Sequence, residues 1–107
     1  MRSLKFIVDG QSLMPDPSCD FDGLVPGTDG YLKAEFTFSE EWNNRVKIAS
    51  FFSVFGKEYI PQVLKDGKSC TIPNEALLRR EFRVMITGRD NNSTIKTNKL
   101  AVCQNGG

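Results

Sequence analysis

The stretch that decides the fold runs from Tyr31 to Phe38 and reads YLKAEFTF. From position 32 on, apolar and polar residues alternate, so that four apolar side chains share one face of an extended chain. Such a two-residue period is typical of a β-strand with one buried face and one face in solvent. We therefore expect a half-buried strand here.

Two further segments repeat this alternation. Leu4, Phe6 and Val8 share one face near the start of the chain, and residues 82–87 alternate in the same way. Each predicts another half-buried strand. Further strands are expected in five other segments, namely residues 46–55, 57–64, 68–72, 94–96 and 99–103.

The segment 46–55 changes phase along its length. Val46 and Ile48 set one phase, but Ala49, Phe51 and Phe55 follow the other. A bulge near Ile48-Ala49 would explain this change, and so would a strand that is covered on both faces.

Turn and helix signals separate these strands. The pair Asp66-Gly67 predicts a hairpin, and Pro61 makes the segment around it an edge strand because proline cannot donate to a sheet. Residues 39–42 and 74–80 could each form a single helical turn, with Ser39 and Asn74 as the caps. Together these signals predict an all-β fold, an immunoglobulin-like antiparallel β-sandwich of about seven or eight strands with one or two single-turn helices.

The size and composition fit one such domain. The chain has 107 residues, of which 39% are hydrophobic and 25% are charged. This is enough for one modest core, so we expect a single domain over residues 1–107. The 14 basic and 13 acidic residues give a net charge of +1, which argues against nucleic-acid binding. No apolar run is long enough for a signal peptide or a membrane span, so we expect a protein made in the cytoplasm with no membrane partner.

The three cysteines are expected to be free thiols rather than a disulfide framework. Cys70 and Cys103 both lie in expected strands, where a buried thiol acts as a small hydrophobe. A bridge between these two residues is the alternative.

No enzyme signature is present in the sequence. The chain has no histidine, which removes the commonest general base and the usual partner of a cysteine nucleophile. Gly56-Lys57 is no phosphate loop, because Phe51 stands where the upstream glycine is needed. We expect neither catalysis nor a cofactor.

One pattern resembles a calcium-binding loop. Ser18, Asp20 and Asp22 alternate before Gly23, and Asp29 stands at the twelfth position of the loop. The serine at the first position, a proline within the loop and the lack of flanking helices favour a solvated turn instead. The calcium reading would suit a cytoplasmic adaptor.

Trp42 is the only tryptophan, and two interpretations of it are open. A core plug beneath a connection is favoured, and an exposed stacking platform is the alternative. With Tyr31, Tyr59 and Phe55, such a platform would suit a carbohydrate-binding module on the same fold.

The spacing of several residues resembles that of a β-sandwich domain common in tail and baseplate proteins of phages and prophages of Gram-positive bacteria. Within this group, the chain is similar to the amino-terminal domain of upper baseplate or fibre-type proteins. That domain attaches a receptor-binding device to the tail. The matching elements are Phe36-x-Phe38, Glu41-Trp42, Lys47-x-Ala49-x-Phe51, Cys70-x-Ile72-Pro73-x-Glu75-x-Leu77, Phe82-x-Val84-x-Ile86-x-Gly88 and Ile95-x-Thr97-Asn98.

The resemblance implies framework residues rather than an active site. These are Trp42, Phe51, Cys70, Pro73 and Gly88, with Pro73 starting a connection and Gly88 ending a strand where the chain turns.

The resemblance also implies a function, which is that of a structural attachment module made in the bacterial cytoplasm and carried in the virion tail. The expected partners are other phage tail or baseplate proteins. A homo-oligomer is expected too, for which a trimer is the leading candidate. Edge strands such as residues 57–64, or the first strand, could pair with a neighbouring subunit.

Overall fold

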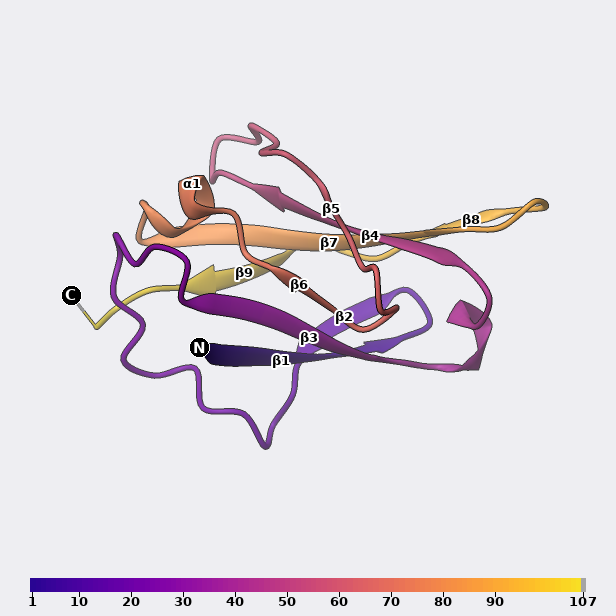
Figure 1. Ribbon diagram of the computed structural model, residues 1–107, viewed down its shortest axis with the longest axis horizontal. Coiled ribbons are helices and arrows are strands. Elements are labelled where there is room, and N and C mark those ends of the chain that lie inside the picture. Colours follow the sequence, from indigo (N-terminus) through magenta and orange to yellow (C-terminus); the bar gives the residue numbers. More distant parts are fainter. Residues whose placement is uncertain (107) are drawn as a thin grey trace.

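A computed structural model describes residues 1–106 of the chain, and it is a β-sandwich (Figure 1). The described residues form nine strands, one 3₁₀ helix and one short α-helix. In chain order these are β1 (Arg2–Asp9), β2 (Ser12–Pro15), β3 (Leu32–Phe38), η1 (Glu40–Trp42), β4 (Val46–Phe52), β5 (Gln62–Val63), β6 (Ser69–Thr71), α1 (Asn74–Leu77), β7 (Glu81–Arg89), β8 (Thr94–Lys96) and β9 (Leu100–Cys103).

The strands form two sheets that pack face to face, which confirms the predicted all-β sandwich. One sheet has the order β2-β1-β3-β6, and the other has the order β5-β4-β7-β8 with β9 also paired to β7. All pairs are antiparallel except β1 with β3, which run parallel from Arg2 opposite Leu32 to Val8 opposite Phe38. A parallel pair needs a long return connection, and the segment between β2 and β3 supplies it.

One hydrophobic core fills the space between the sheets. The expected alternating faces of β1, β3 and β7 all contribute buried side chains to it. The rings of Phe6 and Phe36 stack with centroids 5.2 Å apart, and those of Phe51 and Phe82 lie 6.1 Å apart. Aromatic burial of this kind is a major part of core stability.

Strand β4 is covered on both faces in its second half, so the alternative of a bulge is wrong. Its register with β7 is unbroken from Val46 opposite Arg89 to Phe52 opposite Arg83, and residues 49–52 are all buried. On the outer face the ammonium of Lys99 lies 4.0 Å from the Phe52 ring centroid. The strand also ends earlier than expected, because the chain turns after Phe52.

Three expectations about the strands change in the structure. The segment 57–64 is reduced to the two-residue edge strand β5, which follows Pro61. Asp66-Gly67 does form a turn, but it connects strands of different sheets and is no hairpin. The first strand is not an edge, since β1 lies between β2 and β3.

Thr97 and Asn98 join the two sheets along one side of the sandwich. The Asn98 amide accepts a hydrogen bond from Leu13 N at 2.8 Å and donates one to Leu13 O at 3.3 Å. Thr97 Oγ1 accepts from Ile86 N at 3.0 Å. The side-chain amide of Asn98 thus occupies backbone groups at the edge strand β2 that would otherwise be open to another strand.

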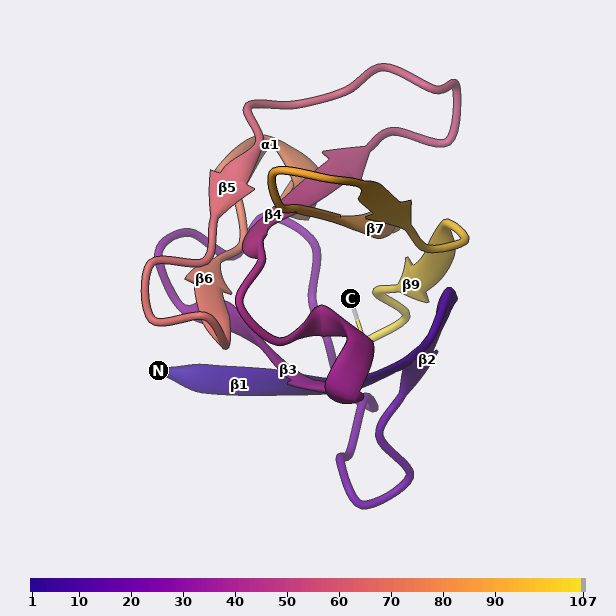
Figure 2. The same ribbon diagram turned by 90° about the vertical axis from the view of Figure 1, so that its right-hand side faces the viewer.

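Trp42 is fully buried at the end of the sandwich that carries η1, which faces the viewer in Figure 2. Its Nε1 donates to Gly10 O at 2.8 Å. A Cβ on Gly88 would lie 2.6 Å from Cζ3 of the Trp42 ring, so only glycine fits there. The strand expected to end at Gly88 ends one residue later, at Arg89, and Gly88 itself makes room for the indole.

Both short helices are present, but their capping differs from expectation. Ser39 occupies the N-cap position of η1, yet its hydroxyl accepts from Gly10 N at 2.9 Å and donates to Glu41. The N-cap residue of α1 is the buried Pro73, while Asn74 Oδ1 accepts from Gly30 N at 3.0 Å. No helix among residues 1–106 is both long and apolar enough to cross a membrane.

Candidate functional site: a hollow at the α1 end

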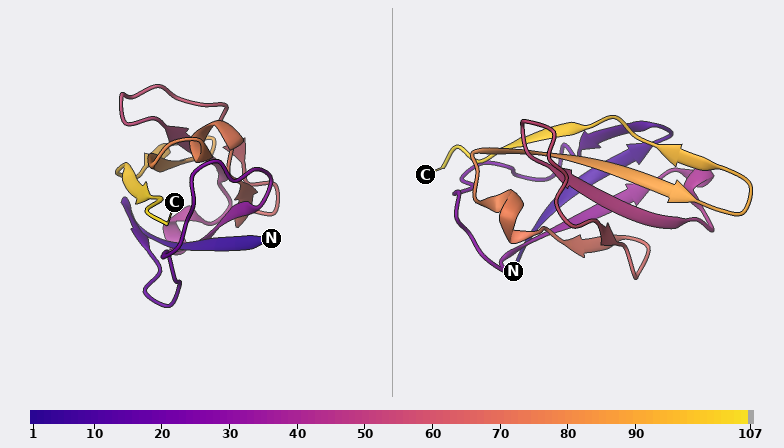
Figure 3. Two further views of the ribbon diagram at one scale, coloured as in Figure 1. Left: turned by 90° about the vertical axis from the view of Figure 1, so that its left-hand side faces the viewer. Right: turned by 90° about the horizontal axis from the view of Figure 1, so that it is seen from above.

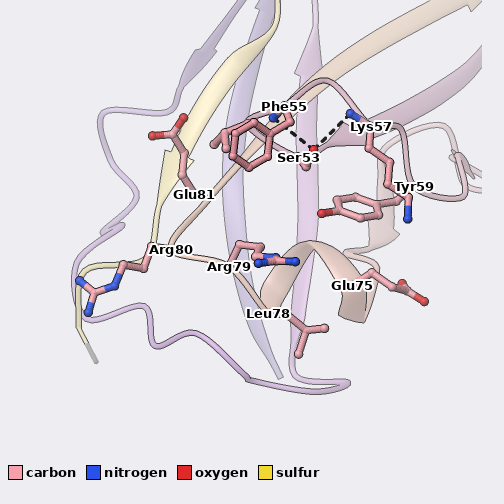
Figure 4. A pocket seen from close by; sticks show the side chains of 10 residues that line it. Ser53, Phe55, Lys57, Tyr59, Glu75, Leu78, Arg79, Arg80 and Glu81 are labelled. Carbon is pink, nitrogen blue, oxygen red and sulfur yellow. Dashed lines mark hydrogen bonds between the residues drawn. The ribbon is translucent and has the colours of Figure 1, made fainter.

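A hollow of about 620 Å³ lies at the end of the sandwich opposite Trp42. The loop between β4 and β5 forms one wall, and α1 with the connection to β7 forms the other (Figure 4; α1 faces the viewer in the left view of Figure 3). We call it the Phe55 hollow. Its lining residues are Ser53, Val54, Phe55, Lys57, Tyr59, Glu75, Leu78, Arg79, Arg80 and Glu81.

The first wall is a tight turn that holds Phe55 in solvent. Ser53 N donates to Lys57 O at 2.8 Å, and Ser53 Oγ accepts from the backbone N–H groups of Phe55 and Lys57 at 3.2 and 3.1 Å. Gly56 has φ of +88°, a conformation that glycine adopts without strain. At the tip of this turn the Phe55 side chain is 94% exposed. Phe55 is therefore displayed by an ordered turn. The expectation that it belongs to a strand over residues 46–55 is wrong.

The second wall is held in place from behind by Gln104. This residue is only 1% exposed, and its Nε2 donates to Leu77 O at 3.1 Å and to Arg79 O at 2.6 Å. Its backbone N–H also donates to Arg80 O at 2.6 Å. With the backbone of residues 77–80 fixed in this way, Leu78 is left 64% exposed beside the hollow.

Among the charged residues that line the hollow, only Glu81 forms an ion pair within residues 1–106. Glu81 lies 3.4 Å from the Arg83 guanidinium. Within residues 1–106, Lys57, Arg79 and Arg80 have no carboxylate within 4.0 Å. Figure 4 shows the Arg79 guanidinium and the Tyr59 hydroxyl pointing into the middle of the hollow, between Phe55 and Leu78. The arrangement offers three unpaired cations and one unpaired carboxylate, Glu75, beside exposed apolar side chains in the described part of the chain.

The structure separates the aromatic residues that the sequence suggested as a platform. Trp42 is in the core, so the core-plug interpretation is confirmed and the Trp42 platform is wrong. Tyr31 is exposed but lines a different hollow, together with Arg2 and Leu24. Only Phe55 and Tyr59 line one hollow together.

The calcium-loop pattern does not form a metal site in the described part of the chain. There, no three side chains of the His, Cys, Asp or Glu type gather closely enough to hold a metal ion, and Asp20, Asp22 and Asp29 are no exception. Asp20 Oδ1 instead accepts from Asp22 N at 2.8 Å. The Arg2 guanidinium donates to the carbonyls of Asp20 and Asp22 at 2.9 and 2.8 Å, so a cation already occupies this side of the loop.

The cysteines are all free thiols. Cys70 is half-buried on β6 opposite Ala34, and burial raises the pKa of its thiol to about 12. Cys103 is exposed on β9 in the other sheet, so neither the bridge nor a buried role for Cys103 is present.

The remaining framework residues hold the scaffold. Phe51 is fully buried in the core, and Pro73 precedes α1 as expected. None of the five framework residues lines the Phe55 hollow.

Three residues that sequence reasoning missed shape the hollow, namely Ser53, Leu78 and Gln104. Leu78 follows the buried pair Ala76-Leu77. A single helical turn buries only one face, and this spacing was the available signal that Leu78 is exposed. Gln104 gave no such signal, because its two carbonyl partners are distant in the sequence.

Comparisons of the chain with protein-family models, with curated proteins and with solved structures give no match.

Proposed function

We propose that this chain is a non-enzymatic attachment module of a phage or prophage tail, which binds other tail or baseplate proteins through the Phe55 hollow. The tail context is supported by the resemblance in spacing from Phe36 to Asn98. The choice of surface is supported by the geometry of the hollow.

The observation that carries the proposal is the exposure of Phe55 on an ordered turn. An aromatic side chain that is 94% exposed gains nothing from folding, yet two hydrogen bonds to Ser53 Oγ fix the turn that presents it. Aromatic residues on rigid elements are frequent energetic centres of protein interfaces. Because little conformational freedom is lost on binding, such a turn favours association.

Attachment is a better account than catalysis for the residues at this site. The groups with shifted pKa values are Asp16, Asp66, Cys70 and Asp90, and none of them lines the hollow. Active sites are where such shifts usually gather. The lining instead combines exposed apolar side chains with cations, which is the composition of an interface centre and its rim.

The test is the presence of the chain in assembled particles. Antibody against the purified protein is used to probe phage particles isolated by density gradient after induction of the source strain. We expect a signal that co-purifies with tails and labels one end of the tail in electron micrographs. A protein that is expressed but absent from purified particles would contradict the proposal.

A further inference from the structure

We propose that the Phe55 hollow binds an acidic peptide segment of its partner, with one apolar side chain placed between Phe55 and Leu78 and an adjacent carboxylate on Arg79. This inference rests on the proposed function only in that the partner is a protein. It adds the chemistry by which that partner is recognised.

The apolar part of the site is formed by two side chains from opposite walls. Phe55 and Leu78 are 94% and 64% exposed, and both line the hollow. A volume of about 620 Å³ is large enough for a side chain and its neighbouring backbone. Burying an apolar side chain against this pair is favourable because it removes apolar surface on both partners from water.

The charge of the site selects the residues that flank this apolar anchor. Lys57, Arg79 and Arg80 line the hollow without a carboxylate partner among residues 1–106. Figure 4 shows the Arg79 guanidinium in the middle of the hollow, while the charged ends of Lys57 and Arg80 lie at its sides. The two carboxylates of the lining lie at its sides, since Glu75 points away from the middle in Figure 4 and Glu81 pairs with Arg83. An incoming carboxylate can take a two-pronged hydrogen bond from the Arg79 guanidinium, with the Tyr59 hydroxyl as a further donor.

Both walls are set before any partner arrives. Ser53 fixes the Phe55 turn, and Gln104 fixes the backbone on either side of Leu78. A preformed site pays less ordering entropy on binding, which favours a short peptide as the occupant.

The experiment is a selection from a displayed library of random short peptides against the full chain. We expect enriched peptides in which a leucine or aromatic residue is flanked by aspartate or glutamate. Fluorescence anisotropy then compares one enriched peptide with the same peptide carrying asparagine and glutamine in place of its acids. We expect the neutral peptide to bind at least about ten-fold more weakly.

Two pairs of variants assign the binding to the hollow. Phe55→Ser should abolish enrichment of this class, whereas Ile60→Ser, at another exposed apolar position, should not. Arg79→Glu should weaken the acidic peptide at least about ten-fold and favour basic flanks, whereas Arg89→Glu on the exposed end of β7 should leave it unchanged. All four side chains are exposed, so circular dichroism should show folded protein in every case.

Several results would overturn the inference. One is enrichment of peptides without acidic residues, or enrichment that survives Phe55→Ser. Others are a Phe55-dependent dimer in light scattering, which would make a second copy the occupant, and Phe55-dependent binding to a glycan array. Each of these can occur with the chain still present in tails, so failure here is distinct from failure of the proposed function.

Discussion

At one end of the sandwich Trp42 and Arg45 are enclosed by bonds to their own chain, and at the other end Phe55 and Arg79 face solvent without a partner. The guanidinium of Arg45 donates to Glu41 O at 2.9 Å and to Ser93 O and Oγ at 3.0 and 2.8 Å. The described chain offers Arg79 no carboxylate within 4.0 Å.

The difference shows how the same kinds of side chain can serve folding at one site and binding at another. An aromatic ring stabilises the fold where it is buried, and a guanidinium does so where hydrogen-bond acceptors surround it, as at the Trp42 end. At the Phe55 end hydrogen bonds fix the backbone that carries the same kinds of group, but the side chains themselves have no partner in the described chain, so their interaction energy is available to a partner. Variants at the first end should therefore change stability, and variants at the second should change binding alone.

The largest expected effect on stability comes from Trp42→Ala. The substitution leaves a large cavity beside Gly88 and removes the hydrogen bond to Gly10 O. We expect a loss of about 3–5 kcal/mol in the free energy of unfolding, measured by urea denaturation. The matched variant Phe55→Ala should lie within about 0.5 kcal/mol of the wild type. Equal losses at both positions would contradict the contrast between the two ends.

A second comparison uses the two arginines. Arg45→Gln removes hydrogen bonds from a guanidinium whose side chain is only 11% exposed, and it should cost about 1.5–3 kcal/mol of unfolding free energy. Arg79→Gln should cost less than about 0.5 kcal/mol, because no bond within the chain is lost. If the Arg45→Gln variant had the same unfolding free energy as the wild type, the Trp42 end would not be held by this side chain.

Gly88→Ala tests the close approach of the β7 backbone to the Trp42 ring. The added methyl group would collide with the rigid indole ring, 2.6 Å from Cζ3 and 2.7 Å from Cε3 of Trp42. We expect overpacking to cost about 1–3 kcal/mol, again from urea denaturation. The double variant Gly88→Ala with Trp42→Ala should recover part of this cost, since the obstructing ring is gone. Full additivity would mean that the two residues do not interact.

The smallest expected effect is a pH dependence at the Trp42 end. Backbone N–H groups of Asn92 and Ser93 hold the pKa of Asp90 below its ordinary value of 3.8. Because the pKa is lowered in the folded state, this contribution to stability is present above pH 3.8 and is lost as the pH falls through the folded pKa. Asp90→Asn should therefore flatten the decline of the urea midpoint below pH 3.8. An unchanged decline would mean that Asp90 contributes nothing to it.

The fold class could be predicted from the sequence because the alternation in β1, β3 and β7 is local. The pairing could not, because the parallel neighbours β1 and β3 are brought together by the long connection after β2. The turn at Asp66-Gly67 has the right local chemistry, yet which sheet receives the next strand depends on the whole core.

The site was harder to predict than the fold. Phe55 continued an apolar phase from Phe51, so it was assigned to a strand, whereas the Ser53 side chain turns the chain away from the sheet. Gly56 was the available signal for that turn. The role of Gly88 had no such signal in the sequence, because only the three-dimensional packing brings the Trp42 ring beside it.

The central claim, attachment through the Phe55 end, is tested most directly by photo-crosslinking in assembled particles. Benzoylphenylalanine replaces Phe55 in one strain and Ile60 in a control strain, and adducts are identified by mass spectrometry after irradiation. The account predicts that position 55 crosslinks to an acidic, apolar-anchored segment of another tail protein, while position 60 does not. Assembled particles with no adduct at position 55, or with the same adduct from both positions, would contradict it.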